Sequence, residues 1–333
     1  MSLSSFSALN HVALGLLALV GAAAIALASM LAWPVRPPPP LASIHAGAKE
    51  IDATGAPDLS RFQARDGTWL AYRVYPAQNG ARDRIAILAH GSSASSIEMN
   101  AVAKALAGAG VTAAALDIRG HGASGTRRDI AYPGQLDDDL ADLIAELRKA
   151  YPAVRFSLIG HSAGGGFALR IAGSPLSDAF DRFVLLAPYL GYDAPTNRPG
   201  SGGWAIADVP RFLGLMALRK LGIDCCESLP TLAFAVRANS AKILNPTYSF
   251  RLMRNFATRG YQVDLAAAHH PMTLISGAAD ELMLADKYAD AVHSVAPSVE
   301  VKLIDGVDHM GIVGNAQGVA AVADDVANTR TGS

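Results

Sequence analysis

The sequence predicts an α/β fold, in which helices cover both faces of a mostly parallel β-sheet. Short apolar runs alternate with longer stretches of helical periodicity along most of the chain. Runs that are apolar throughout, rather than at every second residue, are typical of strands buried on both faces. Strands that alternate with helices pair in parallel through right-handed crossovers. A chain of 333 residues can hold one large domain of this class together with extra segments.

The first element in the chain is an apolar segment from His11 to Trp33, which contains no Asp, Glu, Lys or Arg. This length is sufficient to cross a bilayer as a helix, so we predict a single-pass N-terminal anchor over residues 1–35. A cleaved signal peptide is the alternative, because Ala26-Leu27-Ala28 resembles a cleavage site, although the usual positive charge before the apolar stretch is missing. A buried core helix ranks last, because the segment is apolar all round.

A proline-rich linker is predicted next, over residues 36–60. The consecutive prolines after Arg36 favour an extended spacer, and residues 41–60 show no clear periodicity. Arg36 and Lys49 follow the apolar segment and weakly favour a cytoplasmic domain, whereas export is the commoner fate of N-terminal signals. The sequence therefore leaves the side of the membrane open. The folded domain is predicted over residues 61–330.

The folded domain begins with a predicted antiparallel hairpin at one edge of the sheet. Asp66-Gly67 supplies its tight turn, because glycine readily adopts the positive φ that such a turn needs. Six buried strands and four helices follow. The strands are predicted at 84–89, 111–116, 156–159, 183–187, 272–275 and 299–304, and the helices at 96–109, 134–150, 163–173 and 311–327.

One interval breaks this alternation, between Pro188 and Pro271. It is too long for a simple crossover between two strands. Its first part is rich in Gly and Pro, and residues 211–221 and 248–259 have helical apolar spacing. We predict an inserted helical lid over about residues 189–270. A helical elaboration with no role over a site is the alternative.

Ser162 is the predicted nucleophile. It lies at the centre of a GxSxG pattern, Gly160 to Gly164, between a predicted strand and a predicted helix. The pattern alone arises by chance, but strand, sharp turn and helix are the context that a nucleophile elbow requires. Such a turn exposes the hydroxyl and directs the N-terminus of the following helix toward it, which favours an oxyanion there.

A serine nucleophile needs a base, and His309 is the predicted one. It follows the last predicted strand, at the carboxyl edge where parallel sheets place their reacting groups. Three other downstream histidines have settings that favour structural or solvated roles. These are His269, His270 and His293.

The base needs an acid that fixes its tautomer, and Asp280 is the predicted acid. It follows strand 272–275 at the same edge, and the order Ser, Asp, His matches the nucleophile-elbow enzymes. Glu281 is its immediate rival. Asp305 or Asp308 could instead cap the last helix or pair locally.

Two backbone N–H groups are the predicted oxyanion donors. One belongs to Ala163, which follows the nucleophile, and the other to Ser92, in the loop after strand 84–89. Ser93 is the alternative to Ser92. His90 lies just before a glycine, which favours a hydrogen bond that fixes the turn rather than a chemical role.

These segments together resemble the α/β-hydrolase superfamily, and within it the monoglyceride lipase, lysophospholipase and serine aminopeptidase-like group. The likeness is carried by His90-Gly91, by Asp117 to Gly125 (DIRGHGASG) and by Gly160 to Gly165 (GHSAGG), with Asp280 and His309 in the expected order. It implies an eight-stranded, mostly parallel sheet with a lid inserted after the sixth strand. It also implies that Asp117, Arg119 and His121 have structural roles and are not catalytic. Ala163 stands where such relatives often carry Met, and the lid shows no motif that identifies a substrate.

The predicted function is hydrolysis of carboxylic esters through an acyl-enzyme, with no cofactor. The anchor and the apolar lid favour a lipophilic ester, such as a monoacylglycerol or a lysophospholipid. Amide or peptide cleavage uses the same groups and stays an alternative. Two further alternative functions use the same fold. One is a cofactor-free haloperoxidase or carbon–carbon hydrolase, and the other is a non-catalytic binding protein. The presence of all three triad residues argues against the binding protein.

Composition excludes other partners. Charged residues make up 17% of the chain, apolar residues 51%, and the net charge is −1 at pH 7. Proteins that bind a phosphate backbone usually carry a strong positive balance, so we expect no nucleic-acid partner. Cys225 and Cys226 are adjacent, which disfavours a disulfide between them, and no CxxC spacing or nearby histidine completes a metal site. We therefore expect no metal.

Overall fold

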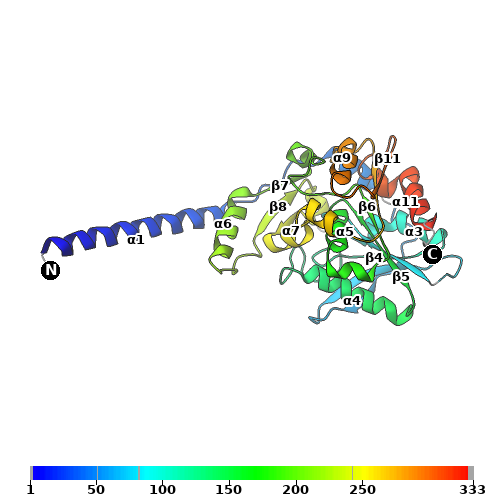
Figure 1. Ribbon diagram of the computed structural model, residues 1–333, viewed down its shortest axis with the longest axis horizontal. Coiled ribbons are helices and arrows are strands. Elements are labelled where there is room, and N and C mark those ends of the chain that lie inside the picture. Colours follow the sequence, from blue (N-terminus) through cyan, green and yellow to red (C-terminus); the bar gives the residue numbers. More distant parts are fainter. Residues whose placement is uncertain (1–2, 51, 82, 242, 329–333) are drawn as a thin grey trace.

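The computed structural model describes residues 3–50, 52–81, 83–241 and 243–328. A long N-terminal helix projects from an α/β body that holds the rest of the chain (Figure 1). The extreme ends of the predicted anchor (residues 1–2) and of the predicted folded domain (residues 329–330) lie outside the described residues.

The body is built on one eight-stranded sheet, in the order β1-β2-β4-β3-β5-β6-β10-β11. All neighbours from β4 to β11 run parallel, and β1 and β2 are antiparallel additions at one edge. This confirms the predicted fold class. The strands are β1 (Ser60–Gln63), β2 (Trp69–Tyr75), β3 (Arg84–Ala89), β4 (Thr112–Leu116), β5 (Arg155–His161), β6 (Arg182–Leu186), β10 (Met272–Gly277) and β11 (Glu300–Ile304).

Burial explains why the apolar runs form strands. Every residue of β4 and β10 is buried, as the uniform hydrophobicity of their sequences predicted. At the edge, Gly67 in the hairpin turn has a φ of +83°, which confirms the Asp66-Gly67 turn. The helices are η1 (Ser96–Met99), α3 (Asn100–Gly108), α4 (Gln135–Ala150), α5 (Ala163–Ala172), η2 (Pro175–Ala179), η5 (Ala285–Lys287), α9 (Tyr288–His293), α10 (Gly311–Gly314) and α11 (Ala316–Asn328).

The last predicted helix, 311–327, is interrupted. Asn315 has extended backbone angles between α10 and α11. The break lets the two pieces fold against each other at Gly318, where an added Cβ would lie 2.5 Å from the carbonyl oxygen of Gly311. The sequence did not predict this break, because it occupies a single residue between two stretches of helical periodicity.

The segment that we predicted to be a lid lies between β6 and β10, the position that the resemblance implied, and it is called the lid segment, or lid, below. It contains α6 (Val209–Lys220), α7 (Phe250–Phe256) and α8 (Tyr261–Ala267), but also an antiparallel sheet of β7 (Ala205–Ala207), β8 (Pro230–Phe234) and β9 (Thr247–Ser249). The prediction of a purely helical lid missed this sheet. Its strands are three to five residues long and β8 begins with a proline, so the sequence carries little strand signal.

The N-terminal segment forms α1 (Leu3–Ala32), within which His11–Ala32 is long and apolar enough to span a membrane. Residues 36–40 have no regular structure, as consecutive prolines predict. The predicted linker also contains a helix, α2 (Ala42–Glu50), that packs on the body. Ile44 is buried there, and a Cβ on Gly47 would lie 2.5 Å from Cβ of Met310. The nine residues of α2 are rich in Ala and Gly and show no clear helical periodicity, so the sequence did not predict this helix.

Candidate active site

Ser162 lies on a strained turn between β5 and α5. Its φ is +52° and its ψ is −115°, a conformation that non-glycine residues rarely adopt. Glycines on both sides make the turn possible. A Cβ on Gly160 would collide with the carbonyl oxygen of Gly164, and a Cβ on Gly164 would lie 2.5 Å from that of His90. The turn thus has the geometry of a nucleophile elbow.

Asp280 and His309 are in direct contact at the carboxyl edge of the sheet. Nδ1 of His309 donates a hydrogen bond of 2.8 Å to Oδ2 of Asp280, and both side chains are buried. The other carboxylate oxygen of Asp280 accepts the main-chain N–H groups of Leu282 and Met283. These bonds hold the carboxylate in one orientation and leave Nε2 of the imidazole for other chemistry.

The charges of this pair reinforce each other. Burial acts to raise the pKa of Asp280, but the attraction of His309 and the hydrogen bonds outweigh it and lower that pKa. Burial likewise acts to lower the pKa of His309, but the charge of Asp280 and its hydrogen bond outweigh it and raise that pKa. The pair therefore stabilises a protonated imidazole at position 309.

The rival acids have other partners. Glu281 accepts the main-chain N–H of His309 at 3.0 Å, so it orients the loop and not the ring. Asp308 accepts the N–H of Gly311 at the start of α10, which matches the capping role considered for it.

A second buried pair lies beside the first and was not predicted. Nδ1 of His161 lies 2.9 Å from Oε1 of Glu98, within hydrogen-bonding distance, and Nε2 of His161 lies 3.1 Å from the carbonyl oxygen of His309. The same oxygen of Glu98 accepts the N–H of Gly91. Although burial acts to raise the pKa of Glu98, His161 and these hydrogen bonds lower it. The pair thus connects three loops around the site.

The loop after β3 carries the predicted oxyanion donor, Ser92. Its hydroxyl accepts a hydrogen bond of 2.8 Å from Nε1 of Trp204 in the lid. The alternative donor, Ser93, has its N–H directed to the hydroxyl of Tyr248 at 2.8 Å. His90 bonds to Gly91 through Nδ1 and accepts the N–H of Ile118 at Nε2, as expected for a residue that fixes a turn.

The segment from Asp117 to His121 is buried and fully engaged in the structure. Asp117 accepts the N–H groups of Ser96 and Ala123, and Arg119 forms ion pairs with Asp66 and Asp139. These contacts fit the structural roles that the resemblance implied.

A pocket of about 400 Å³ opens at Ser162 and His309, within the size range of small-molecule sites. Ser162, His309, Ser92 and Glu98 lie in its wall, so the structure brings the predicted nucleophile and base to one cavity. The lid contributes Trp204, Ile243 and Leu244, and helix α2 contributes Ile44 and His45. Nothing in the sequence near α2 or Trp204 marks them as pocket residues, because these contacts are formed only in the folded chain.

Comparison with known proteins gives one family match. A sequence profile described as serine aminopeptidase, S33, matches residues 80–313, more than two thirds of the chain. A monoacylglycerol lipase of Mycolicibacterium smegmatis is 25% identical over 183 residues, which are 54% of this chain and 62% of that protein. The match therefore spans less than two thirds of that relative.

Solved structures share the architecture. A soluble variant of monoglyceride lipase from Saccharomyces cerevisiae, bound to a substrate analog, aligns with a TM-score of 0.60 and 18% identity over 82% of this chain and 94% of that one. The monoacylglycerol lipase of Paleococcus ferrophilus aligns with a TM-score of 0.54 and 18% identity over 78% of this chain and 98% of that one. At these identities the likeness concerns the fold alone.

Proposed function

The chain belongs to the serine aminopeptidase S33 family and has the α/β-hydrolase fold, and on this premise we propose that it is a serine hydrolase that cleaves carboxylic esters. Ser162 is the nucleophile, His309 the general base and Asp280 the acid that orients it. The observation that carries this proposal is the buried 2.8 Å hydrogen bond between Asp280 and His309, because His309 lines the same cavity as the strained Ser162.

The reaction proceeds in two steps. Oγ of Ser162 attacks the ester carbonyl carbon while Nε2 of His309 takes its proton, and Asp280 stabilises the imidazolium that results. His309 then gives the proton to the leaving alcohol, and an acyl-enzyme remains. Water, deprotonated by His309, attacks that acyl group, and the acid is released with Ser162 restored.

The N–H groups of Ala163 and Ser92 bind the oxyanion in this mechanism. Ala163 is the first residue of α5, where backbone N–H groups point toward the nucleophile and the helix dipole favours negative charge. Ser92 is favoured over Ser93, because the Ser93 N–H is already bonded to Tyr248. No cofactor enters the mechanism.

We further propose that the substrate is a lipophilic ester, such as a monoacylglycerol or a lysophospholipid, and that α1 anchors the enzyme in a membrane. Leu27 and Leu31 of α1 pack with Leu215, Leu218 and Phe250 of the lid. Removal of a signal peptide after Ala28 would delete Leu27 from this cluster, which favours a retained anchor over a cleaved signal.

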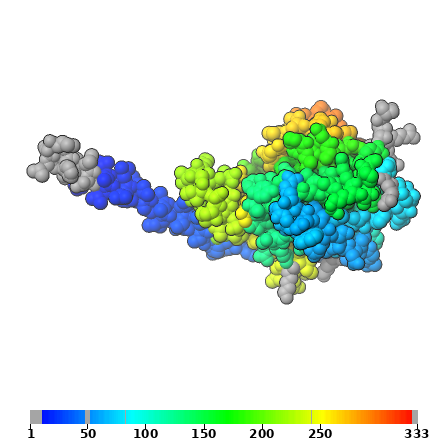
Figure 2. Space-filling view, turned by 90° about the horizontal axis from the view of Figure 1, so that it is seen from below, coloured from blue at the N-terminus to red at the C-terminus, as the bar shows by residue number. Residues whose placement is uncertain are grey.

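The same contact puts α6 beside the end of α1 (Figures 1 and 2). Because Leu27 and Leu31 belong to the membrane-spanning stretch, α6 lies at the level of the bilayer surface. Apolar side chains of the lid are exposed in that region, as expected for contact with lipid. They include Ile206, Val209, Leu213 and Leu221. A pocket beneath such a lid suits a substrate drawn from the bilayer.

A fluorophosphonate probe tests the nucleophile. The full-length protein in detergent should form one covalent adduct, located at Ser162 by peptide mass spectrometry, and Ser162→Ala should form none while its circular dichroism spectrum stays unchanged. Equal labelling of folded Ser162→Ala would refute the assignment, and absence of any adduct would favour a non-catalytic protein.

Matched substrates test the bond and the chain length. We expect p-nitrophenyl esters to be cleaved far faster than the p-nitroanilides of the same acids, and activity to rise with acyl length. Faster cleavage of the anilides would favour the amide hydrolase, and a preference for acetate esters would contradict a lipophilic substrate.

A further inference from the structure

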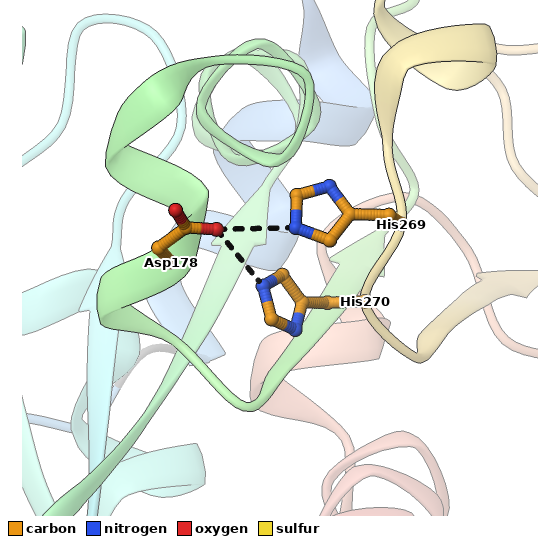
Figure 3. Close-up of side chains that lie close together, drawn as sticks. All are labelled: Asp178, His269 and His270. Atoms are coloured by element: carbon orange, nitrogen blue, oxygen red, sulfur yellow. Dashed lines mark hydrogen bonds and ion pairs between the residues drawn. The ribbon is translucent and has the colours of Figure 1, made fainter.

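Three side chains with metal-binding groups lie close together (Figure 3): Asp178, His269 and His270. Asp178 lies in η2, shortly before β6, and His269 and His270 lie shortly before β10. Because β6 and β10 are parallel neighbours, their first residues share one edge, whereas Ser162, Asp280 and His309 follow the carboxyl ends of strands. This cluster is therefore separate from the pocket.

The spacing of the cluster suits a metal ion. Nε2 of His269 lies 3.1 Å from Oδ1 of Asp178, and Nε2 of His270 lies 3.7 Å from the same oxygen. The three ligand atoms all lie within 4.8 Å of one another. Ligands at about 2.0–2.2 Å from a tetrahedral zinc ion are separated by roughly 3.3–3.6 Å, so small side-chain rotations would complete the site.

A simple hydrogen-bonded cluster accounts for only one of the two histidines. His269 is bonded to the carboxylate, but Nε2 of His270 is shielded from solvent and has no hydrogen-bond partner among the residues that the structure describes. Its 3.7 Å contact with Asp178 is too long for a hydrogen bond, and leaving a buried polar nitrogen without one is unfavourable. A bound cation would satisfy it, with the lone pair of Nε2 as a ligand.

We propose that Asp178, His269 and His270 bind a divalent transition-metal ion of the zinc type. Two imidazoles and one carboxylate suit Zn²⁺ and Co²⁺, whereas Mg²⁺ and Ca²⁺ prefer all-oxygen sites. The side chains of Asp178 and His269 are 80% and 58% exposed, so water can reach the ion and fill its remaining position. The ion would join the segment that ends the lid to the turn that follows the nucleophile helix α5.

Metal binding to the untagged full-length protein in detergent tests this proposal, after chelator treatment and dialysis. We expect Zn²⁺ to bind with a stoichiometry of one by titration calorimetry, and Co²⁺ to give the visible absorption of a tetrahedral site. His270→Ala should weaken Zn²⁺ binding at least tenfold. Zn²⁺ should raise the Tm of the wild type but not of this variant, because only a ligand of the native state stabilises it.

Asp181→Asn is the matched control, because Asp181 is an exposed carboxylate three residues beyond Asp178 and outside the cluster. It should bind Zn²⁺ as the wild type does. No saturable Zn²⁺ binding, or equal binding by folded His269→Ala, His270→Ala and Asp178→Asn, would overturn the proposal. All three variants should keep fluorophosphonate labelling of Ser162, so a failed metal site leaves the proposed hydrolase untouched.

Discussion

Arg211 of α6 donates a hydrogen bond of 2.9 Å from Nε to the main-chain carbonyl oxygen of Leu31, near the end of α1. Its other nitrogens donate to the carbonyl oxygens of Trp33 and Pro230. The last carbonyl groups of a helix have no hydrogen-bond donors within the helix, and this guanidinium supplies such donors. One buried side chain thus joins α1, α6 and β8.

Loss of this connection should affect membrane substrates selectively. We expect Arg211→Ala to lower hydrolysis of a monoacylglycerol in vesicles severalfold more than hydrolysis of a short soluble ester, because the lid no longer holds its place beside the anchor. Arg219→Ala is the control, since Arg219 lies on the same helix but pairs with Glu227. An equal loss on both substrates would indicate general destabilisation instead.

The Glu98–His161 pair should support catalysis by positioning the loops around the active site. We expect Glu98→Gln to lower kcat about tenfold or more with a smaller change in KM, because the loops that carry Ser92 and His309 lose a common fixed point. Stopped-flow kinetics on a p-nitrophenyl ester measures both constants. If kcat stays at the wild-type value while Tm falls, the pair serves stability alone.

The pH dependence should report on His309. Its pKa is raised above the ordinary 6.5 by Asp280, and the base must be unprotonated, so the acid limb of kcat/KM should have its midpoint above 6.5. Activity is then lost as the pH falls through that midpoint. A limb centred at or below 6.5 would contradict the coupling.

Removing the carboxylate charge should move that limb. In Asp280→Asn we expect kcat to fall by about 10⁴-fold, because the amide no longer selects the productive tautomer. The residual activity should show its acid limb at lower pH, since the charge that favours imidazolium is gone. Fluorophosphonate labelling should slow in parallel, and unchanged labelling would remove Asp280 from the mechanism.

The elbow should tolerate no added methyl group. Gly164→Ala places Cβ against the carbonyl oxygens of Ala89 and His90, so we expect a loss of about 1–3 kcal/mol in the free energy of unfolding and little labelling of Ser162. Gly314→Ala is the control, because its added Cβ meets no atom within 4 Å beyond its chain neighbours and its own helix backbone. Urea unfolding of both variants checks the difference.

Much of this arrangement could be predicted because it follows from local patterns and one rule of topology. The apolar runs became strands at nearly the expected bounds, since strands such as β4 and β10 are buried along their whole length. Parallel strands then bring residues after their carboxyl ends to one edge, which placed Asp280 and His309 together.

The remaining features depend on contacts between distant segments. Glu98 reads as an ordinary acid near the start of a helix, and its burial beside His161 becomes visible only in the folded chain. The lid sheet is built from strands too short to show alternation. Helix α2 is defined by its packing against Met310 more than by its own sequence.

Helix α2 affects how a water-soluble version of this protein should be designed. Ile44 and His45 form part of the cavity wall, although they precede the first strand by more than ten residues. A fragment that begins at residue 60 would lack these wall residues and would have a wider cavity mouth. Inhibitors selected against it would fit a cavity that differs from that of the whole chain. A shortened chain should therefore start no later than the prolines at 37–40.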